Sequence, residues 1–182
     1  MDITDLNKVY PKDCYLLPRV DALVDSAMRY EVLCFLDAFK EYHQIRMNKE
    51  DQEKTAFFTN QGVYCYTTIH FGLKNAGTTY QCLVNRIFKS QIGQNVEAYV
   101  DDKLVKSKKT SAFLSDLKEV FEILRDTRMI LNPKKCVFGV ISRKFLGYLV
   151  SRRGIEVNPD KMKAIQEMSP PRCTRDVQRL TG

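Results

Sequence analysis

Apolar residues recur at helical spacing in four stretches of the chain. In the first of these stretches, Val20, Leu23, Val24 and Ala27 fall three or four positions apart and share one face of a helix. The last stretch begins near Pro159, and proline suits the first turn of a helix because it lacks an N–H group. We expect helices over residues 19–28, 76–90, 111–127 and 158–168.

Shorter apolar runs between these stretches predict strands. The run EVLCFLDA, residues 31–38, is typical of a buried strand, with Asp37 at its C-terminal end. Two pairs of runs flank turn signals, which predicts hairpins. A later run has a glycine, Gly147, at its centre. We expect hairpins that join residues 54–59 to 63–69 and residues 95–100 to 103–107, and a single strand over residues 144–150.

The predicted elements, taken from residue 31 onward, follow the order strand, hairpin, helix, hairpin, helix, strand, helix. Helices that alternate with antiparallel hairpins favour an α+β fold over a doubly wound parallel sheet. Residues 1–18 contain two prolines and little periodicity, which predicts an extended entry segment. The chain of 182 residues, 44% of them hydrophobic, is long enough for a domain with a sizeable core. The expected boundary is SPPRC, residues 169–173, where prolines end a helix.

Positive charge is concentrated in the second half of the chain, and the formal net charge is +7. Residues 1–91 carry 11 Lys and Arg against 11 Asp and Glu, whereas residues 92–182 carry 18 against 11. This asymmetry is typical of a surface that binds a polyanion, and it is equally typical of a solvated lysine face. Charge alone leaves both interpretations open.

The soft metal ligands are few and scattered. The six cysteines are spread singly, without a CxxC pair, and the only histidines are His43 and His70. We therefore expect neither a zinc site nor a disulfide framework, and any metal would be held by oxygen atoms. No run is long enough for a membrane span, and the polar, acidic N-terminus is unlike a secretory signal. We expect an intracellular protein, cytoplasmic or nuclear, with no membrane partner.

Three acidic residues form the candidate chemical site. Asp101 and Asp102 stand between two predicted strands, and they can share a site only if a turn lies at or beside them, because consecutive strand residues face opposite ways. Asp37 closes a hydrophobic strand, a costly place for a carboxylate unless a hard cation such as Mg²⁺ binds it. Two such ions about 3.5–4 Å apart promote in-line phosphoryl transfer. An aspartate pair is also common in ordinary hairpin turns.

Several blocks in the sequence resemble one known family in their order and spacing. The family is the reverse transcriptase domain of gypsy-type long-terminal-repeat retrotransposons, especially those of plants. The resemblance covers essentially the whole chain and implies a fragment of a Pol polyprotein, truncated at both ends. The blocks are FLDAFKEYHQI at residues 35–45, FGLKNAGTTYQ at 71–81, YVDD at 99–102, LNPKKCVFGV at 131–140 and KFLGYLVSRRGIEVNPDKMKAI at 144–165.

The resemblance implies a right-hand polymerase palm with partial fingers and the start of a thumb. Residues 1–168 would form the fingers and palm with the primer-grip region, and residues 169–182 the beginning of a truncated thumb. The implied activity is that of an RNA-directed DNA polymerase, in which a primer 3′-hydroxyl attacks the α-phosphate of a deoxynucleoside triphosphate on an RNA or DNA template. The implied cofactors are two Mg²⁺ ions, with Mn²⁺ as a substitute.

Functional residues carry over by their position within these blocks. Asp37 and Asp101 resemble the two principal metal ligands, and Asp102 the flanking third acid. Ala38 resembles the residue that offers its backbone carbonyl to the metal, and Tyr42 the aromatic residue that excludes a 2′-hydroxyl by its bulk. The other implied residues are Phe71 and Gly72 for the nucleotide, Lys74, Asn75 and Gln81 for the template, and Phe145, Leu146, Gly147 and Tyr148 for the primer grip.

Four residues near these positions depart from the family pattern. Lys40 and Glu41 replace Ser-Gly, and we expect the charge of Glu41 to weaken nucleotide binding by repulsion. His70 replaces a rigid proline. Lys103 replaces a hydrophobic residue two positions after Asp101, and we expect its ammonium group to compete with a metal ion for that carboxylate.

The sequence leaves three outcomes open. The chain is an active polymerase fragment, or it is a catalytically dead remnant of a retroelement that at most binds nucleic acid non-specifically. The third outcome is a product too short to fold stably, because missing fingers strands leave a sheet edge exposed to aggregation. The oligomeric state is not predicted.

Overall fold

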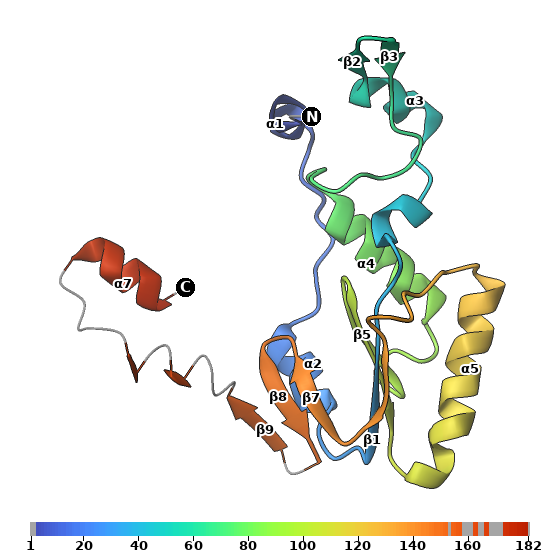
Figure 1. The fold of residues 1–182 in the computed structure, drawn as a ribbon, viewed down its shortest axis with the longest axis vertical. Helices are drawn as coiled ribbons and strands as arrows, with labels where there is room; N and C mark the ends of the chain where they lie inside the picture. The colour runs from blue at the N-terminus through green and yellow to red at the C-terminus, as the bar shows by residue number, and fades with distance from the viewer. Residues whose placement is uncertain (1–2, 153, 158–161, 164–165, 168–172, 182) are drawn as a thin grey trace.

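A β-sheet forms the body of the molecule, and a smaller group of elements lies at one end of it (Figure 1). The computed structural model describes residues 3–152, 154–157, 162–163, 166–167 and 173–181. Within this part of the chain, no helix is long and apolar enough to cross a membrane.

The central sheet has four antiparallel strands in the order β4-β5-β1-β6. Strand β1 lies inside the sheet, with β5 on one side and β6 on the other, and three helices pack on the two faces. The strands are β1 (Val32–Leu36), β4 (Val96–Tyr99), β5 (Asp102–Ser107) and β6 (Val137–Val140), and the helices are α2 (Val20–Ser26), α4 (Ala76–Ile87) and α5 (Phe113–Asp126).

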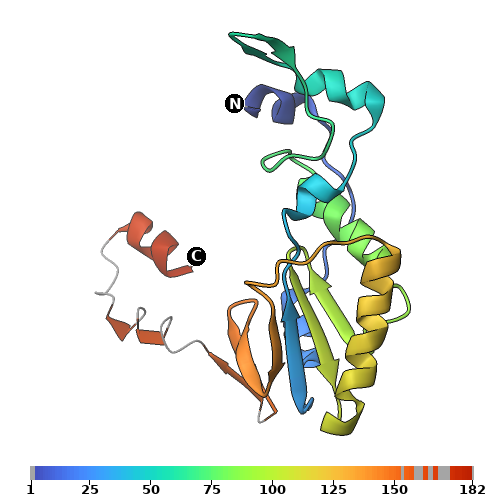
Figure 2. The same cartoon turned by 45° about the vertical axis from the view of Figure 1, so that its right-hand side comes forward.

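Alternate residues of β1 enter two hydrophobic clusters, one on each face of the sheet. Cys34 and Leu36 belong to the cluster formed with α4 and α5. Leu33 belongs to the cluster formed with α2 and Phe145. Figure 2 shows α5 on one side of the sheet and the hairpin that contains Phe145 on the other. Because both faces are covered, β1 is apolar along its whole length instead of alternating with polar residues.

Two smaller antiparallel sheets complete the described strands. One is a hairpin at the far end of the smaller group, next to the helices α1 and α3 (Figure 1). The other packs Phe145 and Val150 against the central sheet. The elements are α1 (Thr4–Val9), α3 (Lys49–Gln52), the hairpin β2 (Phe57–Thr59) and β3 (Gly62–Tyr64), and the three strands β7 (Ser142–Phe145), β8 (Tyr148–Ser151) and β9 (Gly154–Val157).

Most of the predicted elements are confirmed, and with them the α+β class. The helices expected over 19–28, 76–90 and 111–127 are α2, α4 and α5, and the strand expected over 31–38 is β1. Both hairpins form, although β3 ends at Tyr64 and not at residue 69. Most of the helix expected over 158–168 and nearly all of the expected boundary at 169–173 lie outside the described residues, and the last described element is α7 (Thr174–Thr181).

Two predictions from the hydrophobic pattern are wrong. Residues 1–18 are not extended throughout, since α1 forms within them. The single strand expected over 144–150 is a hairpin, in which Leu146 (φ 49°) and Gly147 (φ 89°) form the turn between β7 and β8. Consecutive residues with positive φ are typical of tight hairpin turns, so the central glycine marks a reversal of the chain and not a bulge.

A buried ion pair joins the β4–β5 hairpin to α2. The Nζ atom of Lys106 lies 2.7 Å from Oε1 of Glu97, and the two side chains are 1% and 4% exposed. The same ammonium group donates a hydrogen bond of 2.9 Å to the carbonyl of Ser26 and lies 4.7 Å from the ring centre of Tyr30. These partners offset the cost of removing both charges from water.

We predict that Lys106→Met lowers the free energy of unfolding by about 3–5 kcal/mol, because Glu97 is then a buried charge without its partner. Urea unfolding followed by circular dichroism measures this change. The double variant Glu97→Leu/Lys106→Met is expected to recover most of the loss, since neither charge remains. A double variant that loses as much stability as the sum of the two single variants would contradict this account.

Candidate active site

The register between β1 and β5 brings Asp37 to the start of β5. Leu36, the last residue of β1, pairs with Lys103, the second residue of β5. Asp37, the next residue along the chain, therefore lies beside Asp102, the first residue of β5. Ala38 continues in the same direction as a single antiparallel bridge to Leu131 and is 4% exposed.

The acid pair lies at a hairpin tip, as the sequence predicts. Tyr99 pairs with Asp102, which leaves Val100 and Asp101 as a two-residue turn between β4 and β5. Val100 has a φ of 47°, an unfavourable value for a β-branched residue. The turn is therefore strained at the residue that precedes Asp101, and its shape depends on contacts from elsewhere in the fold.

The three acids divide between two sides of this end of the sheet. Asp37 and Asp102 line a hollow of about 420 Å³ that also faces β7. Asp101 interacts electrostatically with Glu41 and Tyr42 on the opposite side, and also with Asp37. Within the described part of the chain, no three His, Cys, Asp or Glu side chains form a preassembled metal-binding group. The structure therefore gathers the acids in one region without closing them around one point.

Burial and neighbouring negative charges raise the pKa values of two of these acids. Burial raises the pKa of both Asp101 and Asp102, and repulsion from Glu41 is the next largest cause of the rise at Asp101. Carboxylates whose ionised forms are disfavoured in this way gain from a bound cation. Because the donors are oxygen atoms alone, their chemistry fits Mg²⁺ or Mn²⁺.

Lys103 is a cation buried among these acids. Its side chain is 2% exposed, and its Nζ atom lies 4.9 Å from the ring centre of Tyr80. Burial lowers the pKa of Lys103 to about 8, although the four nearby carboxylates act in the opposite direction. Its hydrogen bond of 3.2 Å goes to the backbone carbonyl of Asp101. Lys103 is thus in the expected place, but it donates to the backbone of Asp101 and leaves the carboxylate available.

The residues implied for the nucleotide pocket gather beside Asp101. Tyr42, in the 3₁₀ helix η1 (Glu41–Gln44), lies 6.2 Å from Phe71 and 5.8 Å from Tyr80 between ring centres. Burial, followed by the charge of Asp101, raises the pKa of Tyr42 to about 12, so its hydroxyl keeps its proton at neutral pH. Phe71 is 75% exposed. Tyr42 therefore forms the inner wall of this region and Phe71 its solvent-facing edge.

Gly72 occupies a position that only glycine suits. Its φ is 97°, and a Cβ atom there would lie 3.0 Å from Cδ1 of Ile3. The side-chain amide of Asn7 donates a hydrogen bond of 2.7 Å to the carbonyl of Gly72. The loop after Phe71 is therefore held against the N-terminal segment.

Glu41 acts electrostatically on Asp101, whereas Lys40 lies near the ring of Phe39. The Nζ atom of Lys40 lies 5.7 Å from the ring centre of Phe39, and no ion pair joins Lys40 to Glu41 in the described part of the structure. The charge of Glu41 contributes to the raised pKa of Asp101. His70 packs its ring against Tyr66 with 4.4 Å between ring centres. The departure at Glu41 therefore acts on the site directly.

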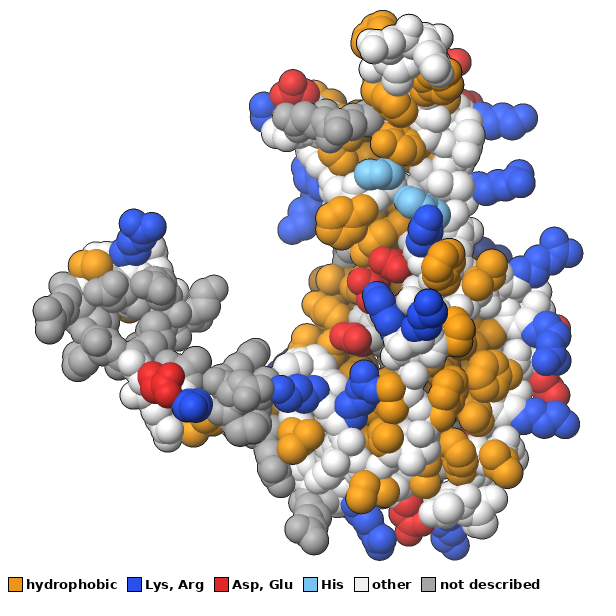
Figure 3. All heavy atoms as spheres, in the orientation of Figure 1, with side chains coloured by type: hydrophobic (Ala, Val, Ile, Leu, Met, Phe, Trp, Pro, Cys, Tyr) orange, Lys and Arg blue, Asp and Glu red, His pale blue; other side chains and the backbone are white. Residues whose placement is uncertain are grey.

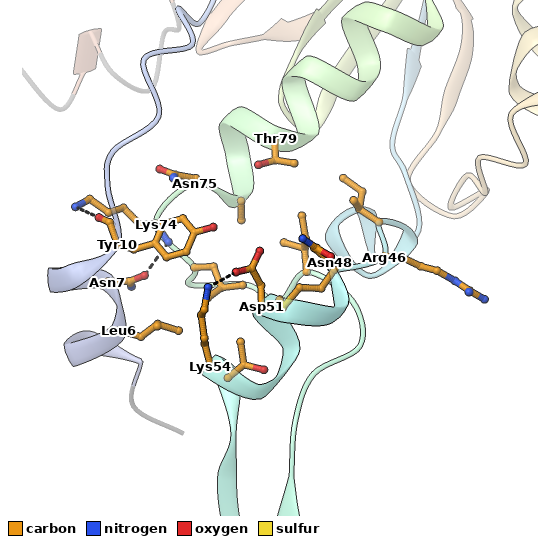
Figure 4. Close-up of a pocket in the computed structure, with 16 residues that line it drawn as sticks. Leu6, Asn7, Tyr10, Arg46, Asn48, Asp51, Lys54, Lys74, Asn75 and Thr79 are labelled. Atoms are coloured by element: carbon orange, nitrogen blue, oxygen red, sulfur yellow. Dashed lines mark hydrogen bonds and ion pairs between the residues drawn. The ribbon is translucent and has the colours of Figure 1, made fainter.

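Lys74 and Asn75, expected near the template, line a pocket of about 230 Å³ between α1, α3 and the start of α4 (Figure 4). The Nζ atom of Lys74 donates a hydrogen bond of 2.9 Å to the carbonyl of Tyr10. The side-chain amide of Asn75 donates one of 2.9 Å to the carbonyl of Pro11. Both residues thus hold the N-terminal segment in place.

Gln81 lies beneath the turn at Val100 and Asp101 and not on the surface expected for a template contact. Its side chain is 0% exposed. Its Oε1 atom accepts a hydrogen bond of 2.5 Å from the N–H of Val100, and its Nε2 atom donates one of 3.1 Å to the carbonyl of Ala98. Asn85 also accepts from Nε2 at 2.9 Å and donates to the hydroxyl of Tyr15 at 2.6 Å. This role is visible in the sequence only as a polar residue inside an apolar helix face.

The residues implied for the primer grip form the turn of the β7–β8 hairpin. Phe145 is 2% exposed and lies 5.9 Å from Phe35 between ring centres, which anchors the hairpin on β1. Leu146 and Gly147 form the turn, and Tyr148 is 39% exposed. The turn therefore lies beside β1, the strand that Asp37 follows.

This arrangement, an antiparallel sheet with acids at the ends of its central strands, defines a polymerase palm. The solved structure of a foamy viral protease-reverse transcriptase in complex with dsDNA aligns with the whole chain at a TM-score of 0.86 and 23% identity, over 38% of that protein. The same viral protein in complex with an RNA/DNA hybrid aligns at 0.83 and 23% identity, over 24% of its length. The palm fold is therefore confirmed.

The family follows from the sequence comparisons. Residues 1–150 match the family model described as reverse transcriptase (RNA-dependent DNA polymerase). Over all 182 residues the chain is 34% and 32% identical to the retrovirus-related Pol polyproteins from transposons opus and gypsy of Drosophila melanogaster. It is 28% identical to the transposon Tf2-3 polyprotein of Schizosaccharomyces pombe. The chain belongs to the reverse transcriptase family, and it spans 14–18% of the length of these relatives.

We predict that Gln81→Leu loosens the turn at Val100 and Asp101, because the N–H of Val100 and the carbonyl of Ala98 lose a buried partner. The expected loss of unfolding free energy is about 1–3 kcal/mol. Hydrogen exchange is expected to be faster at the amide of Val100. Cys82→Ala, an exposed neighbour on α4, is the control and leaves this amide protected. Unchanged protection of Val100 in Gln81→Leu would contradict the bracing role.

Proposed function

We propose that this chain is the polymerase core of an RNA-directed DNA polymerase, which extends a primer 3′-hydroxyl with deoxynucleotides on an RNA or DNA template. The observation that carries the proposal is the position of Asp37 and Asp101 at the ends of adjacent strands, with Tyr42 beside them. The relatives named above are longer polyproteins, so this activity is a proposal for the present chain.

Asp37, Asp101 and Asp102 would hold the two divalent cations, together with the backbone carbonyl of Ala38. When bound, such cations activate the attacking oxygen and stabilise the charge on the leaving one. The raised pKa values of Asp101 and Asp102 support this assignment, since their ionised forms are strained by burial and gain from a cation.

Tyr42 and Phe71 would bind the nucleotide, with the loop at Gly72 completing the pocket. The ring of Tyr42 is fixed between Phe71 and Tyr80, and a rigid ring below the sugar excludes a 2′-hydroxyl by its volume. The turn at residues 145–148 would position the primer end. Lys74 and Asn75 would lie along the template, and Gln81 would act through the catalytic turn.

We assign residues 1–168 to the fingers and palm and residues 169–182 to the start of the thumb. The described α7 is compatible with a helical thumb segment. The partners are a primed template and deoxynucleoside triphosphates.

A binding module without catalysis is the second candidate. Glu41 adds a negative charge beside the nucleotide region, and Lys103 places a cation among the metal-binding acids. The charge of Glu41 opposes the binding of a nucleotide, and the charge of Lys103 opposes the binding of metal ions. Such a module would bind a nucleic-acid duplex with an affinity that falls steeply with salt, because phosphate contacts release counterions.

We predict that the protein extends a primer on an RNA template with Mg²⁺ or Mn²⁺ and that EDTA abolishes the signal. Asp101→Asn is expected to lower the rate by at least about a hundredfold, the scale of losing one electrostatic partner of the reaction. Asp126→Asn removes an exposed acid and serves as the control. Equal rates for the wild type and Asp101→Asn would remove the assigned role. Duplex binding without any extension by the wild type would favour the second candidate.

We predict that Glu41→Gly binds deoxynucleoside triphosphates about tenfold more tightly, which corresponds to about 1.4 kcal/mol. The reason is the removal of charge repulsion beside Asp101 and of side-chain volume. Nucleotide titration at fixed Mg²⁺ measures the affinity, and Glu41→Gln, which keeps the volume, separates the two causes. An affinity in Glu41→Gly equal to or below that of the wild type would show that Glu41 does not border the nucleotide.

A further inference from the structure

The only two histidines of the chain lie next to each other. His43 and His70 are far apart in the sequence, but their ring centres are separated by 5.8 Å and their ring planes are tilted by 31°. Figure 3 shows the two rings, in pale blue, side by side on one face of the molecule. The sequence indicates scattered soft ligands, so this pair is visible only in the fold.

The segments that carry the two rings are paired through their backbones. Arg46 and Thr68 form an antiparallel bridge. The N–H of Ile69 donates a hydrogen bond of 2.9 Å to the carbonyl of Ile45. In an antiparallel pair, the chain before Ile45 runs beside the chain after Ile69. The two histidines belong to these stretches, so the backbone holds their rings close together before any ligand binds.

The ring of His70 is held as metal-binding imidazoles usually are. Its Nδ1 atom lies 2.6 Å from the carbonyl oxygen of Phe71. A carbonyl oxygen only accepts hydrogen bonds, so Nδ1 carries the proton and Nε2 keeps its lone pair. The ring also packs against Tyr66, with 4.4 Å between ring centres. A histidine that binds a metal through one ring nitrogen commonly donates from the other to a backbone carbonyl, which fixes the tautomer and the ring.

His43 offers the second imidazole. It is exposed, and within the described part of the chain no hydrogen bond or ion pair uses its ring nitrogens. A zinc ion lies about 2.0–2.1 Å from an imidazole nitrogen, so one ion of this kind can join two rings whose centres are up to about 6 Å apart. The observed separation of 5.8 Å lies within this reach.

Two imidazoles select a transition-metal ion over Mg²⁺. Mg²⁺ prefers oxygen ligands, whereas Zn²⁺, Cu²⁺ and Ni²⁺ bind imidazole well. Among the described residues, no further His, Cys, Asp or Glu completes a group of three metal ligands with the pair. Water would therefore occupy the remaining positions around the ion, which suits exchangeable binding more than a closed structural site.

We propose that His43 and His70 form a binding site for a divalent transition-metal ion, made of different residues from the three acids. Each histidine has a neighbour in the nucleotide region: Tyr42 precedes His43, and Phe71 follows His70. The rings of these neighbours lie 6.2 Å apart. A bound ion would therefore fasten the loop at Phe71 to the helix η1 that carries Tyr42.

The variants His43→Gln and His70→Gln test the site, each in the chain without an affinity tag. Ni²⁺ is the probe, titrated by calorimetry in excess Mg²⁺, which occupies oxygen ligands and leaves imidazoles free. The control is Cys65→Ser, which removes an exposed soft ligand from the segment that leads to His70. Thermal melts by circular dichroism without Ni²⁺ establish that each variant is folded. His43 is exposed, so its replacement does not touch the core.

We expect one Ni²⁺ ion per wild-type chain and an affinity at least about tenfold weaker in either histidine variant, because the second imidazole no longer binds the ion within the same molecule. The control is expected to keep the affinity of the wild type. A loss in only one of the histidine variants would reveal a lone imidazole ligand and overturn the paired site. Unchanged affinity in both variants, or an equal loss in Cys65→Ser, would overturn it as well.

The titration contains no template, primer or nucleotide, so its outcome is independent of the proposed polymerase function. A protein that fails to extend primers but binds Ni²⁺ through both histidines would refute that function and keep the metal site. A protein that extends primers while both histidine variants bind Ni²⁺ like the wild type would do the reverse.

Discussion

The antiparallel register of β1 with β5 is the constraint on which the candidate site depends. The pairing of Leu36 with Lys103 places Asp37 beside the turn at Val100 and Asp101. A slip by one residue would turn the apolar side chains of β1 to the wrong faces, and both faces are covered by hydrophobic clusters. The same packing that stabilises the sheet therefore fixes the position of Asp37. A change in the core that shifts β1 would also displace this carboxylate.

The consequence is a concentration of charge at one end of an otherwise apolar sheet. Partial burial opposes the ionised forms of Asp101 and Asp102, which still reach solvent, and nearly complete burial opposes the charged form of Lys103. Attraction between these groups reduces that cost without removing it, because the pKa of Lys103 stays depressed despite its acidic neighbours. The charges at this end of the sheet are thus only partly compensated, and perturbed groups of this kind cluster at functional sites.

The sequence predicts those features that local pattern determines. The apolar run ending at Asp37 and the hairpin around Asp101 follow from strand periodicity and turn chemistry, and both are confirmed. The hairpin at Gly147 is missed because a glycine inside a short apolar run indicates a bulge or a turn equally well. The burial of Gln81 is missed for another reason. Its partners, Val100 and Ala98, come from a distant hairpin, so only the tertiary fold reveals them.

The two sides of the site are supported by different parts of the fold. The position of Asp101 depends on the strained turn at Val100, which Gln81 of α4 holds by a hydrogen bond. Gln81 is bonded in turn to Asn85, and Asn85 to Tyr15 in the N-terminal segment. Asp37 depends instead on β1 and on the loop before β6, which is tied to its backbone. Disturbance of the N-terminal segment would therefore reach the turn at Asp101 first and leave the surroundings of Asp37 in place. The environments of Asp101 and Asp37 are for this reason supported independently at one end of the same sheet.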